Sequence, residues 1–339
     1  HTRSDRDWSS DVCSSDLSVD WNPANCPNST TPWSAEAQAA FQFAVDLWEV
    51  ILISNQTIDV MACWSPLAND ILGSATALTA SGNFTNAPIT NIWYPGALAN
   101  SLAEEDLDPS SADILAQFNS NFTNWYLGTD GNPNTNQFDF VSVVLHELGH
   151  GLGFAGTMNV QQGVGSYGLQ GFPIVYDTFA ENGSNQNLVS AFQNGSFTLG
   201  SELISGDIFL DGPNTNQANG NSPAELFAPN PFVRGSSISH LDEGFNDTPH
   251  ALMTFSLSLG EALHDPGDVM LGILSDMGWN ITAAPGGNVT PTATTSSTAT
   301  ATASPTATAT QTATPSLTVT ATQTATSQPA TSTDRKSVV

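Results

Sequence analysis

The spacing of apolar residues predicts a long amphipathic helix near the beginning of the chain. Between residues 34 and 53, apolar side chains recur every three or four positions, at Ala37, Phe41, Ala44, Val45, Trp48 and Leu52. Ser34 stands just before this run, and its hydroxyl can cap the first turn. We therefore expect a helix over Ser34–Ile53 with its apolar face turned to a core.

Strands, a loop-rich segment and a closing helix are predicted along the rest of the chain. Runs of β-forming residues predict four strands, over Thr57–Trp64, Ile71–Leu78, Ile89–Trp93 and Ala112–Asn119. Residues 155–238 are rich in Gly, Asn, Ser and Pro, so we expect loops and short strands there. Val269–Met277 reads as a last helix, and Gly278 is suited to its C-cap.

The chain's main chemical signal lies in a further predicted helix over Asp139–Leu152. The apolar run Phe140–Leu145 leads into His146-Glu147-Leu148-Gly149-His150, and Gly153 suits the end of the helix. Positions i and i+4 of a helix share one face, so both imidazoles can reach one metal ion. Glu147 lies beside them and can hold a water molecule. A surface helix without a metal is the alternative to this interpretation.

A catalytic zinc usually takes three protein ligands, so a third ligand is expected beyond the helix. Apart from terminal His1, the remaining histidines are His240, His250 and His264. The compact H-E-x-x-H-x-x-G-x-x-H pattern is absent, because position 156 is glycine. The spacing alone leaves all three later histidines open.

Three segments resemble the leishmanolysin-type metzincins. The chain looks like a bacterial-type secreted homologue of that family. His146–Phe154 is similar to the active-site helix of that family. Ser239–Glu243, followed by Ala251–Thr254, resembles its third-ligand loop and its Met-turn, and Leu271–Trp279 resembles the helix that comes next. The insertion between His150 and His240 is long, and no inhibitory pro-segment is visible in this sequence.

The resemblance implies an α+β fold, a two-lobed zinc peptidase domain with a mixed sheet and an active-site helix. It implies His146, His150 and His240 as zinc ligands, Glu147 as general base and Met253 as the Met-turn residue, an apolar floor that does not bind the metal. The expected activity is hydrolysis of peptide bonds in protein or peptide substrates by a metal-activated water. An extended substrate needs an exposed edge strand, for which Ala112–Asn119 is the candidate.

Alternatives to this ligand set and to this function exist. His250 competes for the third position, although its place three residues before Met253 would cramp the loop, and His264 lies in a turn typical of a surface or supporting histidine. A carboxylate could be the third ligand instead, and the candidates are Glu181, Glu202 and Glu225. A non-catalytic adhesion module with a structural metal is a third possibility, against which Glu147 argues.

The charge of the chain excludes some partners. The chain has 32 acidic and 5 basic residues and a net charge of −27. Phosphate recognition needs Lys and Arg, so we expect no nucleic-acid partner and no binding to anionic membranes. Acidity of this kind favours solubility outside a cell. The stretch Asp130–Asn134 could hold a structural Ca²⁺, with a plain polar turn as the alternative.

The ends of the sequence resemble translated sequencing-adapter DNA, in Asp7–Leu17 (DWSSDVCSSDL) and Asp334–Val339 (DRKSVV). We therefore expect residues 1–17 and 334–339 to be foreign to the natural protein. These ends contain five of the acidic residues and four of the basic ones, which leaves Arg234 as the single basic residue. Between them we expect a peptidase domain over 18–284, with lobes at 18–154 and 155–284, and a stalk rich in Thr, Ser, Ala and Pro over 285–333.

The remaining cysteines bear on the compartment. With Cys13 set aside, Cys26 and Cys63 can form one disulfide, which suits an extracellular or cell-surface protein; two buried free thiols are the alternative. No run of about 20 apolar residues predicts a membrane span. We expect a monomer.

Overall fold

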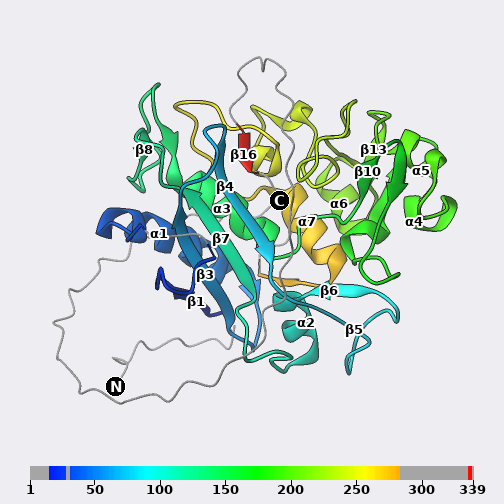
Figure 1. Ribbon diagram of the computed structural model, residues 1–339, viewed down its shortest axis with the longest axis horizontal. Helices are drawn as coiled ribbons and strands as arrows, with labels where there is room; N and C mark the ends of the chain where they lie inside the picture. Colours follow the sequence, from blue (N-terminus) through cyan, green and yellow to red (C-terminus); the bar gives the residue numbers. More distant parts are fainter. Residues whose placement is uncertain (1–14, 28–30, 283–334, 338–339) are drawn as a thin grey trace. The chain divides into compact units, whose positions relative to one another are not determined.

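A mixed five-stranded sheet organises the first half of the chain (Figure 1). The computed structural model describes residues 15–27, 31–282 and 335–337. The sheet has the order β1-β3-β7-β4-β16, with bounds Leu17–Asp20, Ile58–Ser65, Ile114–Asn119, Ile71–Ala77 and Arg335–Ser337. Strands β1, β3 and β7 are parallel, β4 is antiparallel to β7, and β16 is parallel to β4. The predicted combination of helices with a mixed sheet is thus confirmed.

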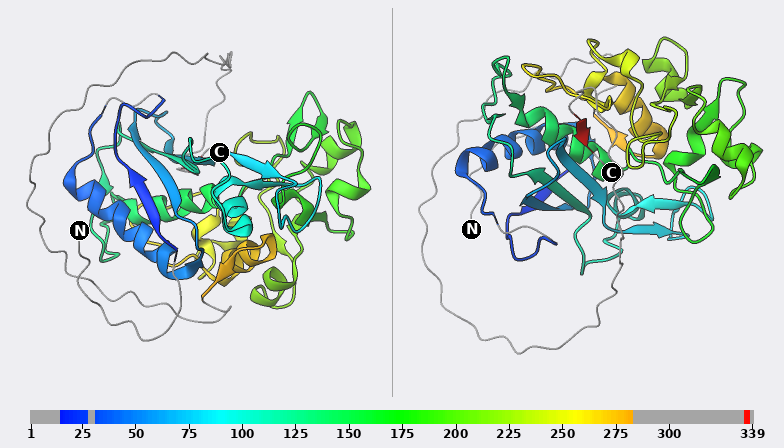
Figure 2. Two further views of the ribbon diagram at one scale, coloured as in Figure 1. Left: turned by 90° about the horizontal axis from the view of Figure 1, so that it is seen from below. Right: turned by 45° about the horizontal axis from the view of Figure 1, so that its top comes forward.

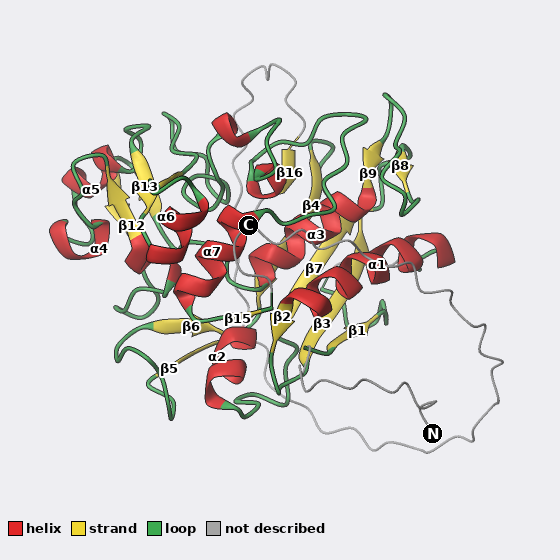
Figure 3. Cartoon of the chain, turned by 180° about the vertical axis from the view of Figure 1, so that it is seen from behind, coloured by secondary structure: helices red, strands yellow, loops and turns green. Residues whose placement is uncertain are grey.

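Two helices cover one face of this sheet, and the two opposite views in Figures 1 and 3 show them on the same side. They are α1 (Ala35–Ile51) and α3 (Phe140–Gly151). As predicted, Ser34 caps α1, and its hydroxyl accepts a hydrogen bond from the amide of Ala37. The indole of Trp48, fully buried, donates to the carbonyl of Leu145 at 3.2 Å and so ties α1 to α3. This contact fixes the depth of α3 in the core.

Smaller elements complete the first half of the domain. They are β2 (Leu52–Ile53), β5 (Ala80–Gly82), β6 (Trp93–Pro95), α2 (Gly96–Ala103), β8 (Trp125–Tyr126) and β9 (Phe138–Asp139). β2 pairs with β15 (Asn280–Ile281), so the end of α1 is joined to the end of the described domain.

The second half consists of short elements, as the composition predicted. Figure 2 shows residues 155–230, in green, at the opposite end of the domain from α1. The strands are β10 (Asn159–Gln161), β11 (Val164–Ser166), β12 (Ala180–Asn182), β13 (Ile208–Leu210) and β14 (Ala224–Glu225). The helices are α4 (Leu188–Ala191), α5 (Phe197–Glu202), α6 (Pro213–Ala218) and α7 (Asp268–Met277), with 3-10 turns η1 (Tyr176–Phe179), η2 (Glu243–Phe245) and η3 (Ala251–Met253). Helix α7 and its glycine cap match the prediction, since Gly278 has φ 119°.

Two sequence-based predictions about strands were wrong. Ile89–Trp93 does not form a strand, because this segment belongs to a turn-rich connection in which Asn86 and Asn91 have positive φ. Only Trp93 enters a strand, at the start of β6. The segment Ala112–Asn119 forms β7, but β7 lies between β3 and β4 and is therefore not an edge strand. Strand order depends on long-range packing, which alternation along one strand does not reveal.

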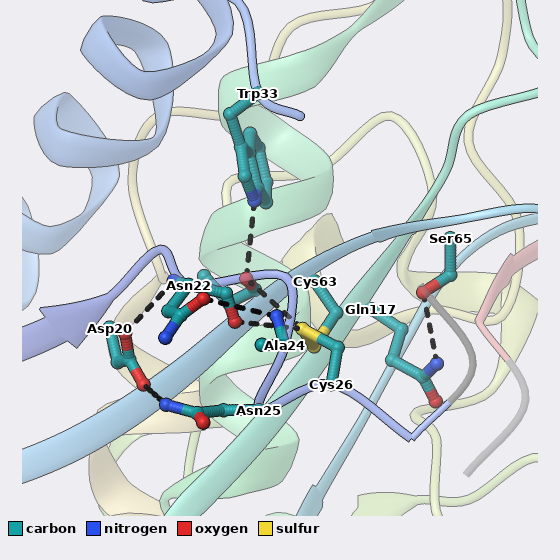
Figure 4. Close-up of a disulfide and its surroundings, with 10 residues drawn as sticks. Asp20, Asn22, Ala24, Asn25, Cys26, Trp33, Cys63, Ser65 and Gln117 are labelled. Carbon is teal, nitrogen blue, oxygen red and sulfur yellow. Dashed lines mark hydrogen bonds between the residues drawn. A yellow bond between two sulfur atoms is a disulfide. The ribbon is translucent and has the colours of Figure 1, made fainter. Parts of the chain in front are cut away.

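The predicted disulfide is present between Cys26 and Cys63, and it joins the segment after β1 to the middle of β3 (Figure 4). Beside it, the indole of Trp33 donates to the carbonyl of Ala62 at 3.1 Å. The disulfide closes a loop with a sequence separation of 37 residues, which contains the whole of α1.

The suspected foreign ends and the predicted stalk fall mostly outside the described residues. Within them, Ser15 donates its amide to the carbonyl of Leu52, Leu17 begins β1, and Arg335–Ser337 forms β16. The stalk over 285–333 lies wholly outside. In the part of the chain that the structure describes, the helices are too short or too polar to span a bilayer.

Candidate metal centre

Helix α3 carries the H-E-x-x-H motif through the middle of the core. Asp139 caps its start, since its Oδ2 accepts from the amide of Ser142 at 2.8 Å and from its hydroxyl at 2.7 Å. Every residue from Phe140 to Gly151 is buried. After Leu152 the chain turns sharply at Gly153, which has φ 117°, a conformation that glycine adopts without steric cost. The apolar run before the motif therefore places both histidines deep inside the domain.

The structure brings His240 to this helix from a loop about ninety residues later in the chain. The ring centroids of His146 and His150 are 4.7 Å apart, and that of His240 lies 5.3 Å from the first and 4.8 Å from the second. One nitrogen from each ring can be chosen so that all three lie within 4.8 Å of one another. The three predicted ligand residues thus form one compact group.

Backbone carbonyls fix how the three rings are turned. The Nδ1 atom of His146 lies 2.6 Å from the carbonyl oxygen of Leu252, that of His150 2.6 Å from Phe154, and that of His240 2.9 Å from Ser236. A carbonyl oxygen only accepts, so each Nδ1 carries the proton and each Nε2 keeps its lone pair. This arrangement, with Nδ1 donating to a carbonyl, is the usual way in which a metal-binding histidine is oriented.

The nitrogen atoms opposite these carbonyls lie close together in two of the rings. The Nε2 atoms of His146 and His150 are 3.0 Å apart, and both rings are buried. Burial lowers the pKa of His150 to about 4, with the hydrogen bond to Phe154 opposing this shift, so protonation of that ring at neutral pH is unfavourable. The donor set therefore fits a divalent cation that prefers imidazole nitrogen, such as Zn²⁺.

The side chain of Glu147 lies against β4, on the side of α3 that faces the sheet. Gly73 of β4 leaves the space, because a Cβ atom there would lie 2.9 Å from Cγ and 3.0 Å from Oε1 of Glu147. Glu147 is fully buried and adjoins His146 in the chain. The carboxylate next to His146 in the chain is thus packed closely against a strand.

Met253 packs against α3 at Gly149. A Cβ atom at Gly149 would lie 3.1 Å from Sδ of Met253 and 2.4 Å from Cε of Met270. Met253 ends η3, and the residue before it, Leu252, supplies the carbonyl that orients His146. The same short turn therefore supports the helix and turns one of its rings.

The other candidate ligands lie elsewhere. His264 bonds through Nε2 to Oδ2 of Asp139 at 2.8 Å and so supports the start of α3, while the ring of His250 contacts that of Phe245. Glu181, Glu202 and Glu225 belong to β12, α5 and β14. Among the described residues, the histidine trio is the one group of three or more side chains arranged to hold a metal ion.

The stretch proposed for calcium forms a polar turn. Asp130 accepts a hydrogen bond from the amide of Asn132 at 3.2 Å and another from the hydroxyl of Tyr126. The hydrogen bond from Tyr126 lowers the pKa of Asp130. The loop thus uses its carboxylate for its own structure.

Sequence reasoning missed the residues that hold the His240 loop, by which we mean residues 236–240. Ile238 in this loop has φ 69° and is fully buried, a conformation that costs a β-branched residue about 1–3 kcal/mol. The hydroxyl of Tyr176 donates to the carbonyl of Ile238 at 2.8 Å. No local pattern signals either residue, because the contact spans 62 positions.

A buried carboxylate stands next to Tyr176. Asp177 accepts hydrogen bonds from the amide of Thr157, at 3.1 and 3.2 Å to its two oxygens, and from the hydroxyl of the same residue. Burial raises the pKa of Asp177 to about 7, against the lowering effect of the hydrogen bonds from Thr157. The amide of Gly156, the residue before Thr157, donates to the hydroxyl of Ser239 at 3.1 Å. The segment after α3 is thus tied to both η1 and the His240 loop.

Comparison with known proteins adds one match. A family model described as SPBPB7E8-like matches residues 83–166, a segment that contains α3 with its two histidines and ends well before His240. The match covers less than half of the chain. No curated protein matches the sequence.

Proposed function

We propose that the chain is a secreted zinc-dependent endopeptidase of the metzincin type, with His146, His150 and His240 as metal ligands. The observation that carries the proposal is the orientation of the three rings. Each Nδ1 points to a backbone carbonyl, and one nitrogen from each ring lies within 4.8 Å of one from each of the others. Three neutral imidazoles match a catalytic zinc site, which takes three protein ligands and leaves a fourth position open.

Zinc bound to the trio would lower the pKa of a coordinated water towards about 7 and polarise a peptide carbonyl. Glu147 supplies the proton transfer: it accepts a proton from the attacking water and delivers it to the nitrogen of the departing amine. Its position next to His146 in the chain and its close packing against Gly73 support this role. Met253 supports the helix from below as an apolar residue.

The outer edge of β4 is the surface that we assign to an extended substrate, in place of the strand predicted from the sequence. Among the other described strands β4 would be the edge, and β16 pairs with it there through Arg335↔Ile71 and Ser337↔Gly73. This pairing supports the proposal because β16 is itself an extended segment that lies along β4. Gly73 contacts Glu147 on its inner side, so a peptide on this edge would run close to the proposed base.

The proposed location is outside the cell. The Cys26–Cys63 disulfide supports it, because disulfides persist in oxidising compartments. The excess of acidic side chains, with Arg234 as the single basic residue between the suspected foreign ends, agrees with a soluble protein in that environment.

The decisive experiment combines metal analysis with cleavage of an unfolded protein substrate by the purified full chain. We expect one equivalent of zinc and cleavage that a chelator abolishes. Glu147→Gln should keep the zinc and lose about 10²–10⁴-fold in kcat/KM, because only the proton transfer is removed. Glu181→Gln is the matched control, a buried glutamate in β12 outside the histidine group, and should retain both zinc and activity.

Other outcomes of the same experiment identify the alternatives. Full cleavage by the Glu147→Gln variant would refute the assigned base. His240→Ala should lose zinc, and retention of zinc and activity would favour a carboxylate as the third ligand. Zinc without cleavage in the unaltered chain would favour a non-catalytic surface module.

A further inference from the structure

The His240 loop is held by contacts that do not involve a metal ion. The amides of Ser236 and Ser237 donate to the carbonyl of Val233, at 3.1 and 2.8 Å, and that of Ser239 donates to Ser236 at 3.3 Å. Ser236 in turn accepts from Nδ1 of His240. The loop is therefore a closed turn, and the direction of the His240 ring depends on the turn being formed.

A single strained residue lies at the centre of this turn. Ile238 is in the left-handed region at φ 69°, where a branched Cβ clashes with its own backbone. Its side chain is fully buried, and its amide donates to the carbonyl of Phe227 at 2.8 Å. The amide of Phe227 donates to the carbonyl of His240 at 2.9 Å, and the loop depends on contacts of this kind to keep Ile238 at positive φ.

A further support of Ile238 is Tyr176, which contacts both the loop and the residue that follows the turn after α3. Its hydroxyl donates to the carbonyl of Ile238, and its ring contacts that of Phe154 with centroids 5.4 Å apart. Phe154 supplies the carbonyl that orients His150. Burial next to Asp177 raises the pKa of Tyr176 well above its usual value, so the hydroxyl stays a donor. One buried side chain thus contacts both the residue whose carbonyl orients His150 and the loop that carries His240.

We propose that Tyr176 is a positioning residue, which holds Ile238 in its strained conformation and so keeps His240 in place for metal binding before the metal arrives. This inference rests on the proposed metal site and adds that the site is preformed. The apparent metal affinity of a chain depends on the fraction of molecules whose loop is already closed. Tyr176 keeps that fraction high, and the strain at Ile238 would lower it.

The test measures Co²⁺ and Zn²⁺ binding to the metal-free full chain, together with hydrogen exchange of its amides. Tyr176→Phe removes only the hydroxyl and leaves the Ile238 carbonyl buried without its donor. We expect the Kd for both ions to rise about tenfold and the amides of the His240 loop to exchange faster. The matched control is Tyr94→Phe. Tyr94 lies in β6 and is also buried, and its hydroxyl accepts a hydrogen bond from the amide of Ile89, which precedes the strand. That variant should keep the Kd within twofold of the parent.

A second variant separates positioning from general damage. Glycine adopts a positive φ without the clash, so a loop with Ile238→Gly should need the Tyr176 hydroxyl less. In that background, Tyr176→Phe should raise the Kd by less than threefold. A Tyr176→Phe protein that binds as tightly as the parent overturns the proposal. So does rapid exchange of the loop amides in the unaltered metal-free chain, a measurement that needs no variant. Neither readout requires peptide cleavage, so a chain that binds metal but cleaves nothing would refute the proposed function and leave this inference standing.

Discussion

Asp177 makes the stability of the domain depend on pH in a direction opposite to that of most surface carboxylates. Its pKa is about 7 in the folded protein, because burial disfavours the charged form, against 3.8 for an ordinary aspartate. Between these two values the folded state keeps a proton that the unfolded chain releases, so stability falls as the pH rises. The slope is about 1.4 kcal/mol per pH unit, and from pH 5 to pH 8 the loss amounts to about 2.5 kcal/mol.

Asp177→Asn removes this dependence and preserves the shape of the side chain. An amide oxygen still accepts from Thr157, and the amide nitrogen can donate to its hydroxyl as a protonated carboxyl would. Urea unfolding of the metal-free chain and of the variant at pH 5, 6, 7 and 8 gives the difference in free energy of unfolding at each pH. The variant should gain about 2.5 kcal/mol on the parent from pH 5 to pH 8, while all other titrating groups cancel. Parallel curves for the two proteins would show that Asp177 titrates as an ordinary aspartate and that its burial has no such cost.

Two further predictions concern the core and the crosslink. Gly149→Ala should destabilise the domain by about 1–3 kcal/mol in thermal or urea unfolding, because the new methyl group would lie 2.4 Å from Cε of Met270. When Met270 is also replaced by alanine, the Gly149→Ala change should cost less stability. An equal cost in the two backgrounds would mean that another contact is responsible. Replacing both Cys26 and Cys63 by serine should lower the free energy of unfolding by about 4 kcal/mol, the loop-closure value for a separation of 37 residues. Reduction of the unaltered protein should cause the same loss. A reduced protein as stable as the oxidised one would contradict a stabilising role of this disulfide.

Elements with a strong local pattern were predictable from the sequence. The apolar stripe and the Ser34 cap of α1, and the glycine cap of α7, act within a few residues, and the structure contains both helices nearly as expected. The prediction of a strand over Ile89–Trp93 was wrong because Asn86 and Asn91, both at positive φ, form turns in this segment despite its β-forming side chains. The helices α4, α5 and α6 have four to six residues, too few for a helical period to appear.

In the candidate metal centre, too, only the residues with a local pattern were predictable from the sequence. His146, Glu147 and His150 follow from one turn of a helix, a local geometry that the motif states directly. His240 could be chosen over His250 and His264 only through the resemblance of its loop to a known family, since no spacing rule connects it to α3. The supports of the rings leave no trace in the sequence at all, because they are backbone carbonyls that any residue type provides.

Those supports explain why the group depends on the whole domain and not on the motif helix alone. The carbonyls that turn the three rings belong to Leu252, Phe154 and Ser236, and each lies beyond the end of α3. Phe154, just after the turn at Gly153, supplies the nearest one. Ser236 and Leu252, which supply the other two, follow strands β10 to β14 in the chain. The loop-rich half of the chain, which has the weakest local signals, therefore sets the geometry of the most recognisable motif in the sequence.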